Sequence, residues 1–92
     1  PEAIAGAGFD LQVYPNPSAG VPTVSFTASG GSVTIEVYDV LGRRIVETRS
    51  HTVPGERWTG RIDAPDLVSG TYFVRVRNER GDVETRAFSI VR

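Results

Sequence analysis

The chain has 92 residues, which is the length of one domain with a single hydrophobic core. It contains no cysteine, so disulfide bonds, thiolate metal sites and thiol catalysis are excluded. The net charge is −1, and the ten basic residues, all arginine, form no basic stripe of the kind that binds nucleic acid. The apolar runs are far shorter than the ~20 residues that span a bilayer, and no signal peptide is visible.

The first eight residues have a different composition from the rest of the chain. Residues 1–8 are mostly alanine and glycine, which is typical of a flexible linker. The chain begins with proline rather than methionine, so we expect it to be a fragment of a longer precursor. The composition therefore predicts a linker over residues 1–8 and one domain over residues 9–92.

From residue 9 onward, apolar and polar residues alternate, which is the period of strands with one buried face. The clearest case is residues 71–77, where Tyr72, Val74 and Val76 share one face. No run has the helical spacing of apolar residues. The alternation predicts seven strands, over residues 9–14, 23–28, 33–38, 44–52, 57–63, 71–77 and 83–91. Seven short strands separated by turn residues predict an all-β protein, a single immunoglobulin-like antiparallel β-sandwich.

Turn residues separate the predicted strands. Asp39 can accept hydrogen bonds from the backbone ahead of it, and Gly42 can adopt positive φ, so the two predict a tight turn. Tyr72 follows Leu67 and Gly70 at the start of a late strand, where its hydroxyl can bond to upstream backbone as in a tyrosine corner. Gly60 lies inside the fifth predicted strand and is expected to mark a bulge.

Residues that could carry catalysis or bind a metal form no recognisable motif. His51 is the only histidine, and no serine stands in a nucleophile-elbow context, so we predict an exposed His51 and no catalytic residue. One histidine without cysteine argues against zinc, and we predict no metal site and no cofactor. Asp63 and Asp66 could contribute to a calcium site, but the alternating oxygen ligands of a calcium loop are missing, which favours turn capping.

Four aromatic residues allow two interpretations. A platform on which sugar rings stack would need exposed aromatic faces, as in carbohydrate-binding sandwiches. A domain of this size also needs its large aromatic side chains for the core and for packing between the sheets. We therefore favour the packing role over a sugar platform for Trp58, Tyr14, Tyr38 and Phe73.

Four stretches of sequence, taken in order, resemble the type A C-terminal sorting domain of type IX secretion substrates, the Por secretion system. The resemblance covers about residues 11–92, and its order and spacing make it specific. The family often ends in lysine, whereas this chain ends in arginine, which keeps the charge. The residues that carry the resemblance are Tyr14, Pro15, Asn16, Pro17 and Gly20, then Asp39, Gly42 and Arg43, then Leu67, Gly70 and Tyr72, and finally Phe88, Ser89, Ile90, Val91 and Arg92.

The resemblance implies a non-catalytic address label on a secreted protein of Bacteroidetes-type bacteria. In that family the precursor folds in the periplasm, and the outer-membrane translocon and its shuttle protein recognise its terminal domain. A cell-surface sortase then removes the domain, and the N-terminal cargo is attached to the cell surface or released. The resemblance thus implies three partners, the translocon, the sortase and the cargo domain, and it places cleavage within residues 1–10, where a flexible segment suits a protease.

Two roles are expected for the motif residues. The terminal strand, Phe88 to Arg92, ends in a basic side chain, and an edge strand can extend a partner's sheet, so we expect these five residues to form the translocon-recognition surface. The proline and glycine motifs restrict the backbone and are expected to act mainly by building the sandwich. Flagellar hook-capping modules share the glycine and tyrosine turns without the secretion role.

Other functions fit the same fold. A carbohydrate- or domain-binding accessory module of a secreted enzyme is the main alternative, and a structural spacer is the second. An enzyme fits least, because no catalytic group is evident. The sorting role requires Arg92 to be the natural C-terminus, whereas a spacer would be followed by more protein.

Overall fold

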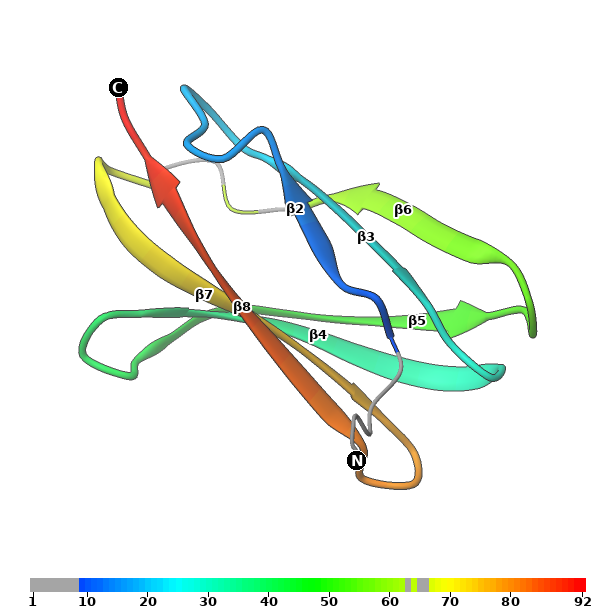
Figure 1. The fold of residues 1–92 in the computed structure, drawn as a ribbon. Coiled ribbons are helices and arrows are strands. Elements are labelled where there is room, and N and C mark those ends of the chain that lie inside the picture. Colours follow the sequence, from blue (N-terminus) through cyan, green and yellow to red (C-terminus); the bar gives the residue numbers. More distant parts are fainter. Residues whose placement is uncertain (1–8, 63, 65–66) are drawn as a thin grey trace, which may run out of the picture.

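The computed structural model describes residues 9–62, 64 and 67–92, whose strands form two antiparallel sheets packed face to face (Figure 1). One sheet has the strand order β2 (Gln12–Tyr14), β3 (Thr23–Thr27) and β6 (Arg57–Arg61). The other has the order β5 (Arg44–Thr52), β4 (Gly31–Asp39), β7 (Gly70–Asn78) and β8 (Val83–Ile90). The predicted all-β sandwich of seven antiparallel strands is confirmed.

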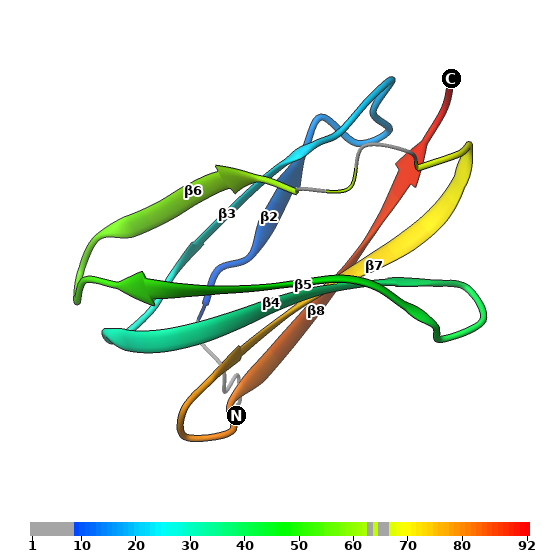
Figure 2. The same cartoon turned by 180° about the vertical axis from the view of Figure 1, so that it is seen from behind.

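The chain passes between the two sheets at three connections. It changes sheet from β3 to β4, from β5 to β6, and again from β6 to β7 (Figures 1 and 2). Such crossings between two antiparallel sheets are typical of immunoglobulin-like sandwiches. Nowhere in the described residues is there a helix that is long and apolar enough to cross a membrane.

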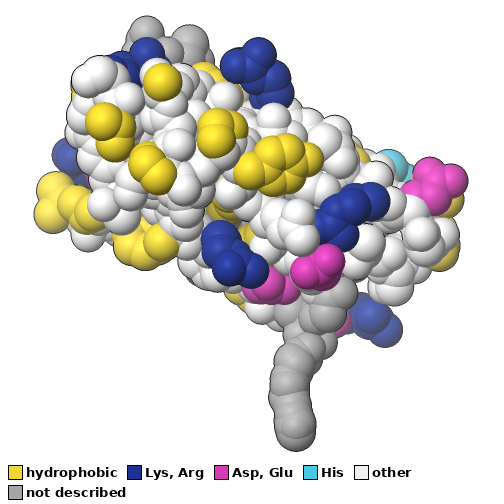
Figure 3. Space-filling view, turned by 45° about the horizontal axis from the view of Figure 1, so that its top comes forward, with side chains coloured by type: hydrophobic (Ala, Val, Ile, Leu, Met, Phe, Trp, Pro, Cys, Tyr) yellow, Lys and Arg dark blue, Asp and Glu magenta, His cyan; other side chains and the backbone are white. Residues whose placement is uncertain are grey.

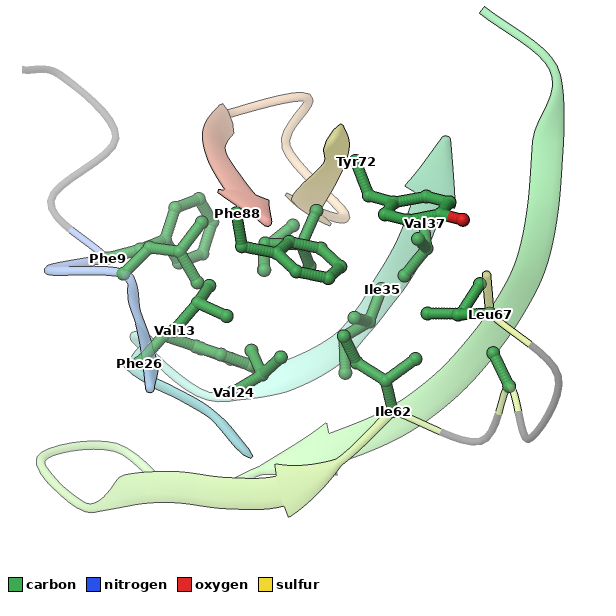
Figure 4. Close-up of a cluster of buried hydrophobic side chains, with 14 of the residues drawn as sticks. Phe9, Val13, Val24, Phe26, Ile35, Val37, Ile62, Leu67, Tyr72 and Phe88 are labelled. Carbon is green, nitrogen blue, oxygen red and sulfur yellow. The ribbon is translucent and has the colours of Figure 1, made fainter. Parts of the chain in front are cut away.

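The core lies between the sheets and is built from the alternate residues that the sequence pattern assigned to it (Figure 4). Phe9 meets Phe26 edge to face with ring centroids 6.1 Å apart, and Tyr72 stacks on Phe88 at 5.7 Å. Burying one such side chain contributes about 1.5–3 kcal/mol. The buried apolar residues are Phe9, Leu11, Val13, Val24, Phe26, Val33, Ile35, Val37, Ile62, Ala64, Leu67, Tyr72, Val74, Val76, Phe88 and Ile90.

The first predicted strand was wrong at its beginning, since β2 covers Gln12–Tyr14 and not residues 9–14. Asp10 has a φ of 51°, which takes the chain out of the extended conformation. The backbone around it is satisfied in other ways: Thr27 N–H donates to Phe9 O at 2.7 Å, and Arg57 donates to Asp10 O at 2.8 Å. Phe9 and Leu11 are therefore buried without belonging to the ladder.

The predicted bulge at Gly60 was also wrong, because β6 pairs with β3 in unbroken register. The glycine is needed for a different reason: a Cβ at this position would lie 2.6 Å from the ring of Trp58. That ring stacks on Phe26 at 5.0 Å and donates from Nε1 to Ser50 Oγ at 2.9 Å, so it is fixed in place. The one register shift in the four-stranded sheet lies between Val37 and Tyr38.

Candidate functional site

The four motif stretches, which lie far apart in the sequence, meet at one end of the sandwich. Asp39 at the end of β4 is opposite Tyr72 near the start of β7. Gly70 in turn is opposite Ile90 at the end of β8, and Ser18 forms an isolated parallel bridge with Ile90. Figure 1 shows the C-terminus beside the connection from β2 to β3 at this end. We call this end of the molecule the motif end.

The first motif binds the outer edge of the last strand. Ser89 N–H donates to Asn16 Oδ1 at 2.9 Å, and Asn16 Nδ2 donates to Ala87 O at 3.4 Å. Ser18 N–H donates to Ser89 O at 2.9 Å, and Val91 N–H donates to Ser18 O at 2.8 Å. The Asn16 and Ser18 segment thus covers the C-terminal part of an edge that would otherwise be open for strand addition.

Replacing Asn16 by alanine is expected to destabilise the domain by about 1 kcal/mol, the usual net contribution of surface hydrogen bonds. The effect should be local: the amide of Ser89 loses its acceptor, whereas the amide of Val91 keeps its bond to Ser18 O. Hydrogen exchange resolved by residue measures both amides, with the exposed Gln12→Ala as the control. Unchanged exchange at Ser89 would show that Asn16 does not hold the last strand.

The third motif forms a tyrosine corner that also receives the C-terminus. Tyr72 Oη donates to Val68 O at 2.7 Å, which confirms the predicted corner. Arg92 Nε donates to Leu67 O at 2.6 Å, and Arg92 N–H donates to Ser69 Oγ at 3.0 Å. The loop before β7 therefore fixes the position in which the last residues leave the sheet.

The second motif is the tight turn between β4 and β5 that the sequence predicts. Asp39 Oδ1 accepts hydrogen bonds from Leu41 N–H and Arg43 N–H, both at 2.9 Å, and Gly42 has a φ of 82°. The Arg43 backbone N–H, together with the Arg43 side chain and the Leu41 N–H, holds the pKa of Asp39 below its usual value. This turn projects Val40 and Leu41 into solvent.

The motif end carries the most exposed aliphatic side chains in the described part of the chain. Leu41 is 73% exposed, Val68 69%, Val40 65% and Val91 59%. We call these four residues the apolar end surface. Figure 3 shows hydrophobic side chains gathered toward the end of the molecule that carries the C-terminus in Figure 1. Several exposed aliphatic side chains at one end are typical of an interaction surface.

The structure places the five residues of the predicted recognition strand in two different environments. Phe88 and Ile90 are each 1% exposed and belong to the core, so a partner cannot reach their side chains in the folded domain. The outer backbone groups of Ser89 are already bonded to Asn16 and Ser18. Val91 and Arg92 are exposed. Strand addition at this segment would therefore require the first motif to move away.

The sequence reasoning missed Val40, Leu41 and Val68 as surface residues. The exposure of Val40 and Leu41 could have been predicted from the sequence, because both lie inside the turn that Asp39 and Gly42 close. A turn of this kind leaves its central side chains in solvent. Val68 is the residue whose carbonyl accepts the Tyr72 hydroxyl, and its own side chain is exposed.

The other candidate sites form no functional cluster among the described residues. Trp58 packs against the core between the sheets, while Tyr38 lies under the guanidinium of Arg75, 5.0 Å from its ring centroid, on the outer face of the other sheet. Phe73 lies opposite Tyr38 in the pairing of β4 with β7, so two of the four aromatic residues are neighbours on that outer face, whereas Trp58 packs elsewhere. His51 is exposed, and no group of metal-ligating residues occurs within residues 9–62, 64 and 67–92. Asp63, Asp66 and the predicted linker lie outside the described residues.

Comparison with known proteins agrees with the resemblance. The family model described as "Secretion system C-terminal sorting domain" matches residues 12–90. A solved structure of PorZ from Porphyromonas gingivalis, an essential surface component of the type IX secretion system, has a TM-score of 0.60 to this chain. The identity is 22%, and the match covers 90% of this chain and 12% of PorZ, so it supports the fold alone. No curated protein sequence matches the chain. The match over residues 12–90 shows that the chain belongs to the secretion system C-terminal sorting domain family.

Proposed function

We propose that this domain directs an attached cargo protein through the outer-membrane translocon of a type IX secretion system. The observation that carries the proposal is the family match over residues 12–90, which includes the first three motif stretches and Phe88, Ser89 and Ile90 of the fourth. The domain acts in this role as a folded address label without catalysis. Its cargo crosses the periplasm and reaches the cell surface or the medium.

The motif end is the surface that we propose for recognition. The apolar end surface supplies exposed aliphatic side chains, and Arg43 and Arg92 lie beside it as cationic groups. A partner would gain apolar contact area from Leu41, Val68 and Val91 in the folded domain. This proposal keeps Val91 and Arg92 from the predicted recognition strand and assigns a structural role to Phe88 and Ile90.

Sortase cleavage, as the second step, is placed ahead of the folded domain. Phe9 is 1% exposed and its carbonyl accepts the Thr27 N–H, so a protease cannot take the chain into its active site at this residue without unfolding it. We therefore place the cut within residues 1–8. Attachment of the cargo to the cell surface, or its release, follows this cut.

A reporter fusion tests the proposed function. Residues 1–92 are placed behind a signal peptide and a fluorescent protein, in a host with this secretion system and in the same host without its translocon. The proposal predicts fluorescence at the cell surface or in the medium only where the translocon is present. Retention of the fusion in the periplasm of both hosts would refute the proposal, and delivery in both hosts would show another export route.

A further inference from the structure

The β5 edge of the four-stranded sheet differs from the covered edge of β8. The strand has nine residues, Arg44–Thr52, and β4 is its one strand neighbour among the described residues. A typical strand has about five or six residues. Its other edge runs along the side of the sandwich, starting next to the turn between β4 and β5 (Figure 2). A long strand with one free edge is a template for pairing with another chain.

The free edge is straight and held in position. The register with β4 is continuous from Gly31 opposite Thr52 to Val37 opposite Val46. Trp58 donates to Ser50 Oγ from the other sheet, which fixes the inner face of β5. Proteins protect such edges with prolines, bulges or charged side chains. The strand β5 has no proline, its register shift lies at the Arg44 end, and its charged Glu47 and Arg49 restrict pairing to a strand of complementary charge.

The charges on β5 are arranged so that a second copy can pair with them in one register. Glu47 and Arg49 lie on the outer face of the sheet, where Glu47 Oε1 is 3.2 Å from Arg44 Nη1 and Glu47 Oε2 is 4.0 Å from Arg49 Nε. In an antiparallel pair of two β5 strands with the two-fold axis at Thr48, each Glu47 faces an Arg49 of the second copy. An axis at Glu47 or at Arg49 instead places like charges opposite each other, which is unfavourable.

We propose that a second copy of this chain binds along the free edge of β5, with the two-fold axis at Thr48. The two sheets then continue into one another, and the contact is isologous because the same strand serves on both sides. Two complementary charge pairs and the backbone ladder hold the dimer in this register. The β5 edge starts beside the turn that carries Val40 and Leu41 but contains no residue of the apolar end surface, so this proposal stands whether or not the domain is a sorting signal.

Cross-linking through an introduced thiol tests the position of the axis. The chain has no cysteine, so Thr48→Cys provides a single thiol per molecule. Opposite residues in an antiparallel pair have Cα atoms about 4.5–5.5 Å apart, within the range of a disulfide. We expect Thr48→Cys to form a disulfide-linked dimer under mild oxidation, while the exposed Thr85→Cys on β8 stays monomeric. Equal cross-linking of both variants, or of Thr85→Cys alone, would overturn the proposal.

Charge reversal tests the pairing itself. In sedimentation equilibrium, Glu47→Arg and Arg49→Glu should each dimerise about tenfold more weakly than the unmodified chain, because each places like charges across the axis. A mixture of the two variants restores both opposite-charge pairs, and we expect it to form a heterodimer as tight as the original dimer. Circular dichroism confirms that each variant is folded. An unmodified chain that is monomeric at ~1 mM, or a mixture no tighter than its components, contradicts the proposal.

Discussion

Phe88→Ala is expected to destabilise the domain by about 3–5 kcal/mol, as is usual for large-to-small changes in a core. Phe88 is 1% exposed and its ring stacks on Tyr72 at 5.7 Å, so the substitution leaves a cavity under the tyrosine corner. A domain of this length has a total stability of roughly 5–14 kcal/mol. Phe88→Ala therefore removes a large fraction of the free energy of unfolding. Chemical denaturation of both proteins measures this loss.

Val91→Ala is the matched control, because Val91 is 59% exposed. It should change the free energy of unfolding by less than about 0.5 kcal/mol. This contrast matters for export assays, because deleting residues 88–92 removes the core side chains of Phe88 and Ile90 and is expected to destabilise the domain strongly. Equal stability of Phe88→Ala and Val91→Ala would show that the last strand is not part of the core.

Glu36→Gln is expected to cost about 1–3 kcal/mol at neutral pH, within the range for hydrogen bonds to a buried charged group. Glu36 is 2% exposed, and Arg75 donates to its Oε1 from both Nε and Nη2 at 3.2 Å. Arg44 Nη1 lies 3.4 Å from Oε2. Both arginines are partly exposed and can regain water when the carboxylate is lost, so the cost stays below that of a fully buried pair.

The same substitution should change the pH dependence of stability. Burial raises the pKa of Glu36, but the hydrogen bonds from Arg75 and the charges of Arg75 and Arg77 outweigh it and hold the pKa below its ordinary value. The stabilisation is thus complete above the unfolded pKa of about 4.3 and is lost as the pH falls through the lower folded pKa. We expect the stability difference between the unmodified chain and Glu36→Gln to shrink as the pH falls from the unfolded pKa through the folded pKa of Glu36.

The exposed Glu56→Gln serves as the control for this titration. It should leave both the neutral stability and its pH dependence within about 0.5 kcal/mol of the unmodified chain. A difference between Glu36→Gln and the unmodified chain that is constant from neutral pH to pH 3 would contradict the ionised state of Glu36 in the fold.

Much of the fold could be predicted from the sequence, because the alternation of apolar and polar residues in a strand and the residue types that form a turn are local features of the chain. The strand over residues 44–52 was predicted at its observed bounds, and the Asp39 turn and the tyrosine corner formed as expected. The errors came from non-local causes. Asp10 leaves the ladder because Arg57 and Thr27 bond to the backbone around it, and Gly60 makes room for a ring that Ser50 holds.

The motif end could be predicted only in part. The sequence showed four motifs, but it did not show that Asn16 bonds to Ser89 or that Arg92 bonds to Leu67, contacts across 73 and 25 positions. Such contacts depend on strand order and register, which the alternation of residues does not specify. The predicted recognition strand was read as accessible because the covering of its edge by Ser18 is invisible in the sequence.

The recognition role of the motif end is tested most directly by export of a reporter fusion that carries Leu41→Ser, Val68→Ser and Val91→Ser. The matched control fusion carries Val53→Ser and Val83→Ser, two exposed sites at the opposite end, after β5 and at the start of β8. Thermal denaturation first establishes that both variants are folded. We predict that the control reaches the cell surface like the unmodified fusion, while the triple variant stays in the periplasm. Surface delivery of the triple variant at the unmodified level would contradict recognition through the apolar end surface.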